Sequence, residues 1–169
     1  MSRYAQGFNP YTGPLTLPKH DRMESAKQAF VAGSEKVTAA KPFPRVFDLW
    51  STALKLAVAE ELDPPEGEKL EVRRFHDNIG VLISGDIPLM ALIATVAVRH
   101  GYRYEGMPFE EAIQILDEPS AQIQTANRYA YVGATRLLEV LERQSTAPGP
   151  AVTRHFQKLV QPRLLATGP

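Results

Sequence analysis

The hydrophobic positions of this chain recur mostly at three- and four-residue steps, the spacing that collects side chains on one face of an α-helix. Prolines, glycines and short polar runs separate the periodic stretches, as expected of connections between helices. We predict helices over 44–62, 68–83, 87–100, 108–117 and 120–143, and one short helix over 21–32. The pattern therefore predicts an all-α fold, a bundle of about five helices.

The segment 87–100 is predicted to be the central helix of this bundle. It is apolar on every side, with Thr95 as its polar interruption. A helix without a polar face belongs inside a bundle. Asp86 is placed as its N-cap, Pro88 lies in the first turn, and Gly101 is expected to end it in a left-handed C-cap. Its β-branched residues leave a buried strand as the alternative.

Three other segments carry specific expectations about which side chains face inward. The 68–83 helix is predicted to align apolar side chains at Val72, Phe75, Ile79, Leu82 and Ile83. The 108–117 helix, opened by Pro108, is predicted to turn inward Phe109, Ala112, Ile113 and Leu116. The small residues Ala130, Gly133 and Ala134 on the last helix should permit a close helix crossing.

The ends of the chain differ from its middle. Residues 1–43 are rich in proline and glycine and predict an irregular, basic arm containing one short helix. Residues 44–144 form the predicted helical domain, and 145–169 a basic linker and flexible tail. Apolar residues in the tail, from Val152 to Val160, suggest one or two amphipathic turns that either pack back or dock onto another protein.

A net charge of zero conceals a strong asymmetry. Residues 1–45 hold seven Lys/Arg and three Asp/Glu, 46–142 hold eight and sixteen, and 143–169 hold four and none. Basic ends thus flank an acidic body. Such ends can contact phosphate or an acidic partner, or fold back onto the acidic body itself.

Composition limits the chemistry and the compartment. With 44% hydrophobic residues the chain can form a core, and without cysteine it can form neither disulfides nor thiolate metal sites. We expect a cytoplasmic protein, since 1–18 lacks the continuous apolar stretch of a secretory signal. We also expect no membrane segment: 79–98 is apolar, but Asp86 and Pro88 would lie near mid-bilayer.

Candidate catalytic residues are few. His76 and Asp77 form the one adjacent His-acid pair, and a metal-dependent hydrolase of the HD type would need further ligands on neighbouring helices. A histidine on the inward face of a helix is more simply a core residue. The common phosphate-loop, dinucleotide, zinc-protease and serine-hydrolase motifs are absent from the sequence. We therefore predict no cofactor, no metal and no catalytic site.

Two surfaces are candidates for binding. Tyrosine, arginine and surplus apolar side chains predict a protein interface at Tyr102, Tyr104, Tyr129, Val132, Arg136 and Val140. Basic side chains of the two ends are the nucleic-acid candidates: Arg3, Lys19, Arg22, Arg154, Lys158 and Arg163.

The sequence favours a non-catalytic helical subunit or adaptor that binds another protein or a second copy of itself, within an assembly that could process nucleic acid. Direct nucleic-acid binding through the basic ends is the first alternative, and the HD-type hydrolase is the second.

Overall fold

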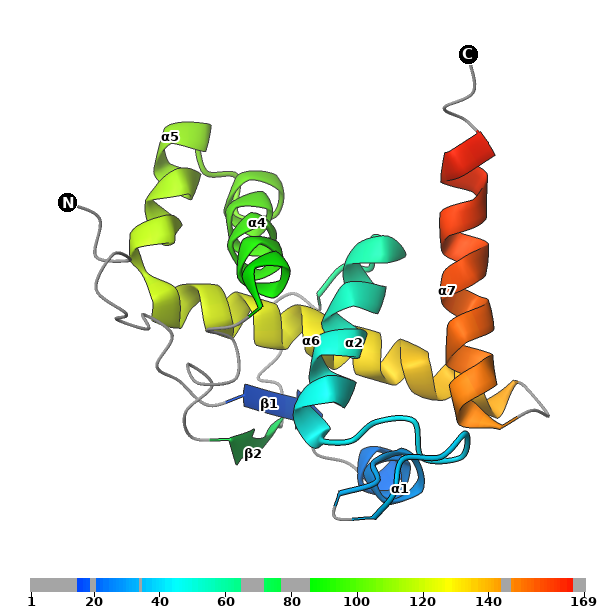
Figure 1. The fold of residues 1–169 in the computed structure, drawn as a ribbon. Coiled ribbons are helices and arrows are strands. Elements are labelled where there is room, and N and C mark those ends of the chain that lie inside the picture. Colours follow the sequence, from blue (N-terminus) through cyan, green and yellow to red (C-terminus); the bar gives the residue numbers. More distant parts are fainter. Residues whose placement is uncertain are drawn as a thin grey trace. The chain divides into compact units, whose positions relative to one another are not determined.

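The computed structural model describes residues 15–18, 21–33, 35–64, 72–76, 86–143 and 147–165, and it is predominantly helical (Figure 1). The prediction of an all-α bundle is confirmed. The described chain forms two compact units. One holds α4, α5, η2 and the start of α6, and the other holds α1, α2, α7 and α6 from Tyr129 onward. The predicted division into arm, helical domain and tail stays a prediction.

Helix α2 (Val46–Ala59) supplies much of the core of its unit, in agreement with the predicted helix over 44–62. Trp50, Leu54 and Ala57 are completely buried at the expected spacing. The Asp48 carboxylate accepts hydrogen bonds from both the backbone amide and the guanidinium of Arg45, which joins the N-cap residue to the first turn. The Asp48 carboxylate thereby satisfies the backbone amide of the N-cap residue at the point where the helix begins.

Helix α6 (Pro119–Glu142) confirms the predicted helix over 120–143 and crosses α2 closely at Gly133. A Cβ at Gly133 would lie 1.8 Å from the carbonyl oxygen of Ala53. The prediction that small residues permit a close crossing is therefore confirmed.

Helix α1 (Asp21–Phe30) is the short helix predicted over 21–32, and an ordered loop follows it. Backbone hydrogen bonds join the end of α1 to Phe43, with Ala32 N donating to Phe43 O at 2.7 Å and Phe43 N to Phe30 O at 3.1 Å. Gly33 adopts a φ of 61°, which permits the turn between them.

The tail contains an 18-residue helix, α7 (Pro148–Leu165), where the sequence suggested only one or two turns. Its start packs back within its unit: Ala151 is completely buried, and Gly149 N donates to Ala39 O at 2.8 Å. Pro148 and Pro150 are tolerated because the first turn of a helix does not use their missing amides.

Helix α4 (Ile87–Arg103) begins as predicted, with the Asp86 carboxylate accepting from Leu89 N at 2.9 Å. Gly101 does not end the helix, however, and that expectation is wrong. The helix continues to Arg103, and the positive φ occurs at Gly106. Gly101 instead leaves room for Met107 and Ala112, which a Cβ would meet at 3.3 Å and 3.5 Å.

The all-apolar sequence of α4 buries one face rather than its whole circumference. Leu89, Ile93 and Ala97 are completely buried, whereas Ile87 is 72% exposed. Short elements follow it: α5 (Phe109–Ala112) and the 3-10 helix η2 (Ile113–Asp117), where one helix over 108–117 was predicted.

The predicted helix over 68–83 is wrong at its described residues. Val72–His76 is a strand, β2, which pairs with β1 (Leu15–Pro18) in a two-stranded sheet. The pairing partner lies more than fifty residues earlier in the chain, so the local helical period carried no information about it. Leu15 and Leu17 of β1 are buried, which gives this pairing apolar support.

Candidate functional site

Helix α4 contacts α5 and η2, the two short elements that follow it (Figure 1), and this part of the chain carries five exposed large apolar side chains. Their exposed fractions are Tyr102 54%, Met107 39%, Phe109 56%, Ile113 39% and Leu116 41%. We call these residues the apolar patch. The other exposed large apolar side chains of the described chain, Val37 and Ile87, lie elsewhere in the sequence. An apolar cluster of this kind on a protein surface is typical of a binding site.

A tight connection between α4 and α5 determines which of these side chains point outward. Met107 N donates to Gly101 O at 3.1 Å, and Ala112 lies next to Gly101, where an added Cβ would be 3.5 Å from the Ala112 Cβ. Ala112 is 1% exposed and is the buried member of the stripe predicted to face inward. Phe109 turns outward and meets Tyr102 edge to face, with ring centroids 6.3 Å apart. The predicted inward orientation of Phe109 is therefore wrong.

The 3-10 geometry of η2 places Ile113 and Leu116 on one side, because residues three apart eclipse each other in this helix. Both are exposed, so the predicted inward orientation is wrong for them as well. Gln122, which is 1% exposed, donates from Nε2 to Ile115 O and Leu116 O, each at 3.0 Å. The Gln122 side chain thus attaches η2 to α6, while Ile113 and Leu116 of η2 face solvent.

Exposed carboxylates surround the apolar patch in sequence: Glu105, Glu110, Glu111, Asp117 and Glu118, which we call the acidic rim. Glu105 lies 3.6 Å from His100 Nε2. The other four form no ion pair with any residue that the structure describes. Arg103 is the one basic residue between 102 and 118. Residues 102–118, which contain the patch, therefore carry five exposed acids and one basic residue.

His100 lies buried on α4 in the same unit. Its Nε2 is 3.0 Å from Arg128 Nη1, and its ring stacks on Tyr104 with centroids 5.4 Å apart. Burial, with the charge of Arg128, lowers the pKa of His100, while the Glu105 carboxylate opposes this shift. A neutral ring that accepts from Arg128 at Nε2 satisfies this geometry. We assign His100 a structural role near the C-terminal end of α4.

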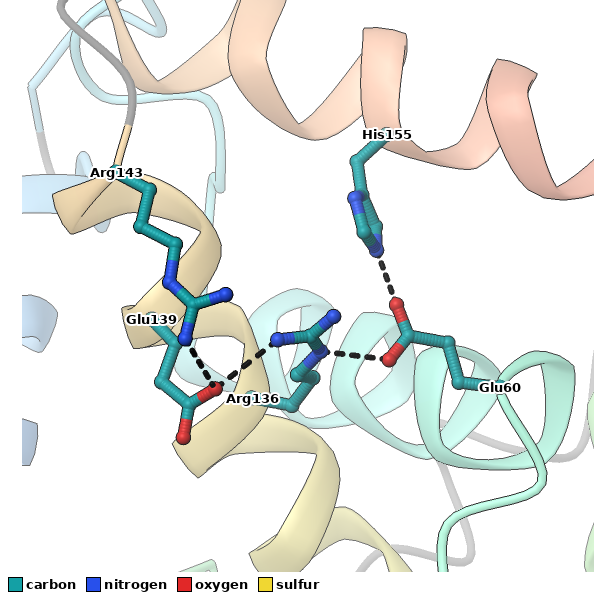
Figure 2. A network of polar contacts seen from close by, with 5 residues as sticks. All are labelled: Glu60, Arg136, Glu139, Arg143 and His155. Atoms are coloured by element: carbon teal, nitrogen blue, oxygen red, sulfur yellow. Dashed lines mark hydrogen bonds and ion pairs between the residues drawn. The ribbon is translucent and has the colours of Figure 1, made fainter.

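A polar network joins α2, α6 and α7 in the other unit (Figure 2). Glu60, at the C-cap of α2, accepts from Arg136 Nε at 2.6 Å through Oε2 and contacts His155 Nε2 through Oε1. Arg136 also donates to Glu139 Oε2 at 3.0 Å, and Arg143 lies 3.8 Å from the same oxygen. We call these five residues the Glu60 network.

The Glu60 network is held together by charge. Burial, the largest single influence, would raise the pKa of Glu60, but its hydrogen bonds and charge interactions with Arg136 and His155 together outweigh burial and lower it. The hydrogen bond to Glu60, followed by that to Glu139, raises the pKa of Arg136. Both carboxylate oxygens of Glu60 have partners. The network therefore fastens α7 to α2 and α6, and its arrangement suits a structural role.

The structure places the predicted interface residues in different environments. Tyr102 is in the apolar patch, and Tyr104 is half-buried against His100. Tyr129 and Val140 are only 4% and 5% exposed. The expectation that α6 leaves them on the surface is wrong, because the close crossing at Gly133 brings neighbouring backbone over that face. Val132 is half-buried, and Arg136 belongs to the Glu60 network.

The structure describes the side chains of only two of the six residues predicted to bind nucleic acid. Arg154 and Lys158 are exposed one turn apart on α7. Arg3 and Lys19 lie outside the described residues, as do the side chains of Arg22 and Arg163. Binding of nucleic acid through these residues stays a prediction.

The candidate residues for a hydrolase, His76 and Asp77, lie largely outside the part of the chain that the structure describes. His76 ends β2, but its side chain and all of Asp77 are not among the described residues. Within the described part of the chain, no three His, Cys, Asp or Glu side chains are grouped to hold a metal ion. No described helix is both long and apolar enough to cross a membrane. The cytoplasmic location stays a prediction.

Comparison of the chain with protein-family models, with curated proteins and with solved structures found no match in any of them.

Proposed function

We propose that this chain is a non-catalytic adaptor or subunit that binds another protein through the apolar patch. The carrying observation is that the amphipathic stripe of 109–116 is exposed at three of its four apolar positions. In an isolated globular protein such a stripe normally faces the core. An exposed stripe of this kind is best explained by a partner that covers it.

The composition of the patch supports a protein partner. Tyr102 and Phe109 already contact each other edge to face, which presents a preassembled aromatic surface. Aromatic side chains with Met are enriched at protein interfaces, because they bury a large area at a small cost in conformational entropy. Complete burial of one large apolar side chain stabilises a complex by about 1.5–3 kcal/mol. Several together can support a specific, moderately tight contact.

The underlying structure is suited to this role. Ala112 and Gln122, both 1% exposed, hold α5 and η2 onto the rest of their unit by packing and by hydrogen bonding. A preorganised surface loses less conformational entropy on binding than a flexible one. The patch side chains of α5 and η2 are thus exposed, while the backbone that carries them is held in place by buried contacts.

Affinity purification from the native cells tests this proposal. The tagged wild-type chain is compared with Phe109→Ser/Leu116→Ser, and with the control variants Ile87→Ser and Val37→Ser, which also remove an exposed apolar side chain. We expect the same protein to be recovered with the wild type and both controls and to be lost with the double variant. Recovery of an unchanged set of proteins with all four chains would contradict the proposal.

A further inference from the structure

We propose that the occupant of the apolar patch is a positively charged amphipathic segment of another protein, one that places apolar side chains on the patch and Lys or Arg against the acidic rim. This inference rests on the proposed function and specifies the partner. The inference rests on two observations: the acidic rim lies next to the patch in sequence, and four of its carboxylates form no ion pair with a described residue.

The acidic rim supplies uncompensated negative charge. Glu110, Glu111, Asp117 and Glu118 are exposed, and none forms an ion pair with a described residue. Several carboxylates of the other unit are paired with nearby basic side chains, as Asp48 is with Arg45 and Glu139 is with Arg136. The four rim carboxylates lie close together in sequence and have no such partner among the described residues. A partner with basic residues would complete the same pattern of local neutralisation.

The sequence positions of these carboxylates favour specific recognition of one peptide segment of the partner over non-specific attraction of any positively charged molecule. Glu110 and Glu111 lie between the patch residues Phe109 and Ile113, and Asp117 directly follows Leu116. Apolar and acidic positions thus alternate within single turns of α5 and η2. A complementary segment needs apolar and basic residues at similarly short intervals, which is the pattern of a basic amphipathic helix or strand. Charge complementarity of this kind also accelerates association.

The same charges argue against four other occupants. In a two-fold dimer through this patch, each acidic rim would face a copy of itself, and like charges would oppose association. Nucleic acid and anionic membranes carry phosphate, which the rim repels. A neutral apolar partner would leave the rim carboxylates without compensation. A basic segment is the occupant that satisfies both features of the surface.

Three synthetic helical peptides test the inference by fluorescence anisotropy with the full chain. They share one apolar face and carry Lys, Gln or Glu at all polar positions. We expect the Lys peptide to bind at least about tenfold more tightly than the Gln peptide, equivalent to ~1.4 kcal/mol, and the Glu peptide to bind most weakly. Raising the salt from about 0.05 M to about 0.5 M should largely remove this ranking, since screening shortens the reach of charges.

Charge-reversed variants locate the effect. Glu110→Lys/Glu111→Lys should abolish the preference for the Lys peptide, because two lysines would then largely offset the three rim carboxylates that remain. Glu35→Lys/Glu61→Lys changes the net charge of the chain equally, at exposed acids of the other unit, and should keep the wild-type ranking. A Lys preference that survives reversal of Glu110 and Glu111 would overturn the inference.

The outcomes separate this inference from the proposed function. If all three peptides bind equally and Phe109→Ser/Leu116→Ser abolishes binding, the patch is a docking site and the basic partner is wrong. If that double variant leaves peptide binding unchanged, or no peptide binds, both proposals are contradicted. If the wild type sediments as a dimer that the double variant dissociates, the occupant is a second copy and the basic partner is again wrong.

Discussion

Gly133 of α6 lies directly against the backbone of Ala53 in α2, so closely that a Cβ on residue 133 would stand 1.8 Å from the Ala53 carbonyl oxygen. No flexible side chain can move aside there, because the obstacle is helical backbone. We predict that Gly133→Ala lowers the free energy of unfolding by about 2 kcal/mol or more. The overpacking penalty should exceed the ~1 kcal/mol that alanine gains over glycine in a helix.

Gly101→Ala is the matched control, since it adds the same methyl group within helix α4. The nearest obstacle is the Met107 sulfur at 3.3 Å, the end of a flexible side chain. We expect unfolding by denaturant to show a change within about 1 kcal/mol of zero, because the helix-propensity gain offsets the repacking cost. Equal destabilisation by both substitutions would mean that the close crossing at Gly133 is not what constrains that position.

The Glu60 network should make stability sensitive to acid. The pKa of Glu60 lies below its ordinary value of 4.5 in the folded protein, so the unfolded state takes up its proton first as the pH falls. The contribution of Glu60 is fully present above about pH 4.5 and is lost as the pH falls through the folded pKa. Glu60→Gln should therefore lower stability near pH 7 by about 1–3 kcal/mol.

Denaturant titrations of the wild type and Glu60→Gln at several pH values check this. The difference between them should shrink below about pH 4.5, where the wild type also loses the charge. Arg143→Gln is the control: the Arg143 side chain is 73% exposed and its guanidinium lies 3.8 Å from Glu139, so its removal should cost less than about 0.5 kcal/mol. A pH-independent difference for Glu60→Gln would contradict the charge-based account.

The elements that local periodicity predicted correctly are those whose packing follows from their own sequence. Helix α2 is an example, because its apolar stripe is completely buried at Trp50, Leu54 and Ala57. The start of α4 is another, since Asp86 caps the helix through a residue only three positions away. The strand β2 could not be found in this way, because it depends on β1, a distant segment of the predicted irregular arm.

The candidate site was predictable in composition but not in orientation. The stripe of Phe109, Ile113 and Leu116 was recognised as apolar, and Tyr102 as an interface residue. Periodicity cannot tell an inward stripe from an outward one. In the structure Ala112 is the buried member of the stripe, near Gly101 of α4, and Phe109, Ile113 and Leu116 are exposed. The Glu60 network was missed altogether, because Glu60 and His155 are 95 residues apart and no local pattern connects them.

His100 predicts a second pH effect in a different range. Burial and Arg128 lower its pKa below the ordinary 6.5, so below about pH 6.5 the unfolded state binds a proton that the folded state still rejects. Stability should decline from this pH until the folded pKa is reached. We expect His100→Gln to reduce the loss of unfolding free energy between about pH 7.5 and about pH 5.5. An NMR titration of the ring should give a midpoint below 6.5; a midpoint above it would contradict the assignment.

Gln122 should control the order of the patch without touching its exposed surface. Its amide donates to Ile115 O and Leu116 O, and it is almost completely buried. Gln122→Leu keeps a similar size but removes both hydrogen bonds, which should cost about 1–3 kcal/mol, because Leu116 O loses this donor and Ile115 O keeps only the Glu118 amide. Hydrogen exchange should accelerate at the amides of η2 more than at those of α2. Uniform acceleration across the chain would show that Gln122 acts on global stability alone.

Substitutions in the apolar patch should weaken partner binding while leaving the free energy of unfolding nearly unchanged. Phe109 and Leu116 are 56% and 41% exposed, so Phe109→Ser/Leu116→Ser removes little buried area and should change the free energy of unfolding by less than about 1 kcal/mol. Ala112→Leu, one turn away but at a position 1% exposed, should cost about 1–3 kcal/mol through overpacking against Gly101. Thermal unfolding of the two variants measures the contrast. A large loss of stability in the double serine variant would mean that these side chains support the fold itself, and the patch would then no longer require a partner to explain its apolar residues.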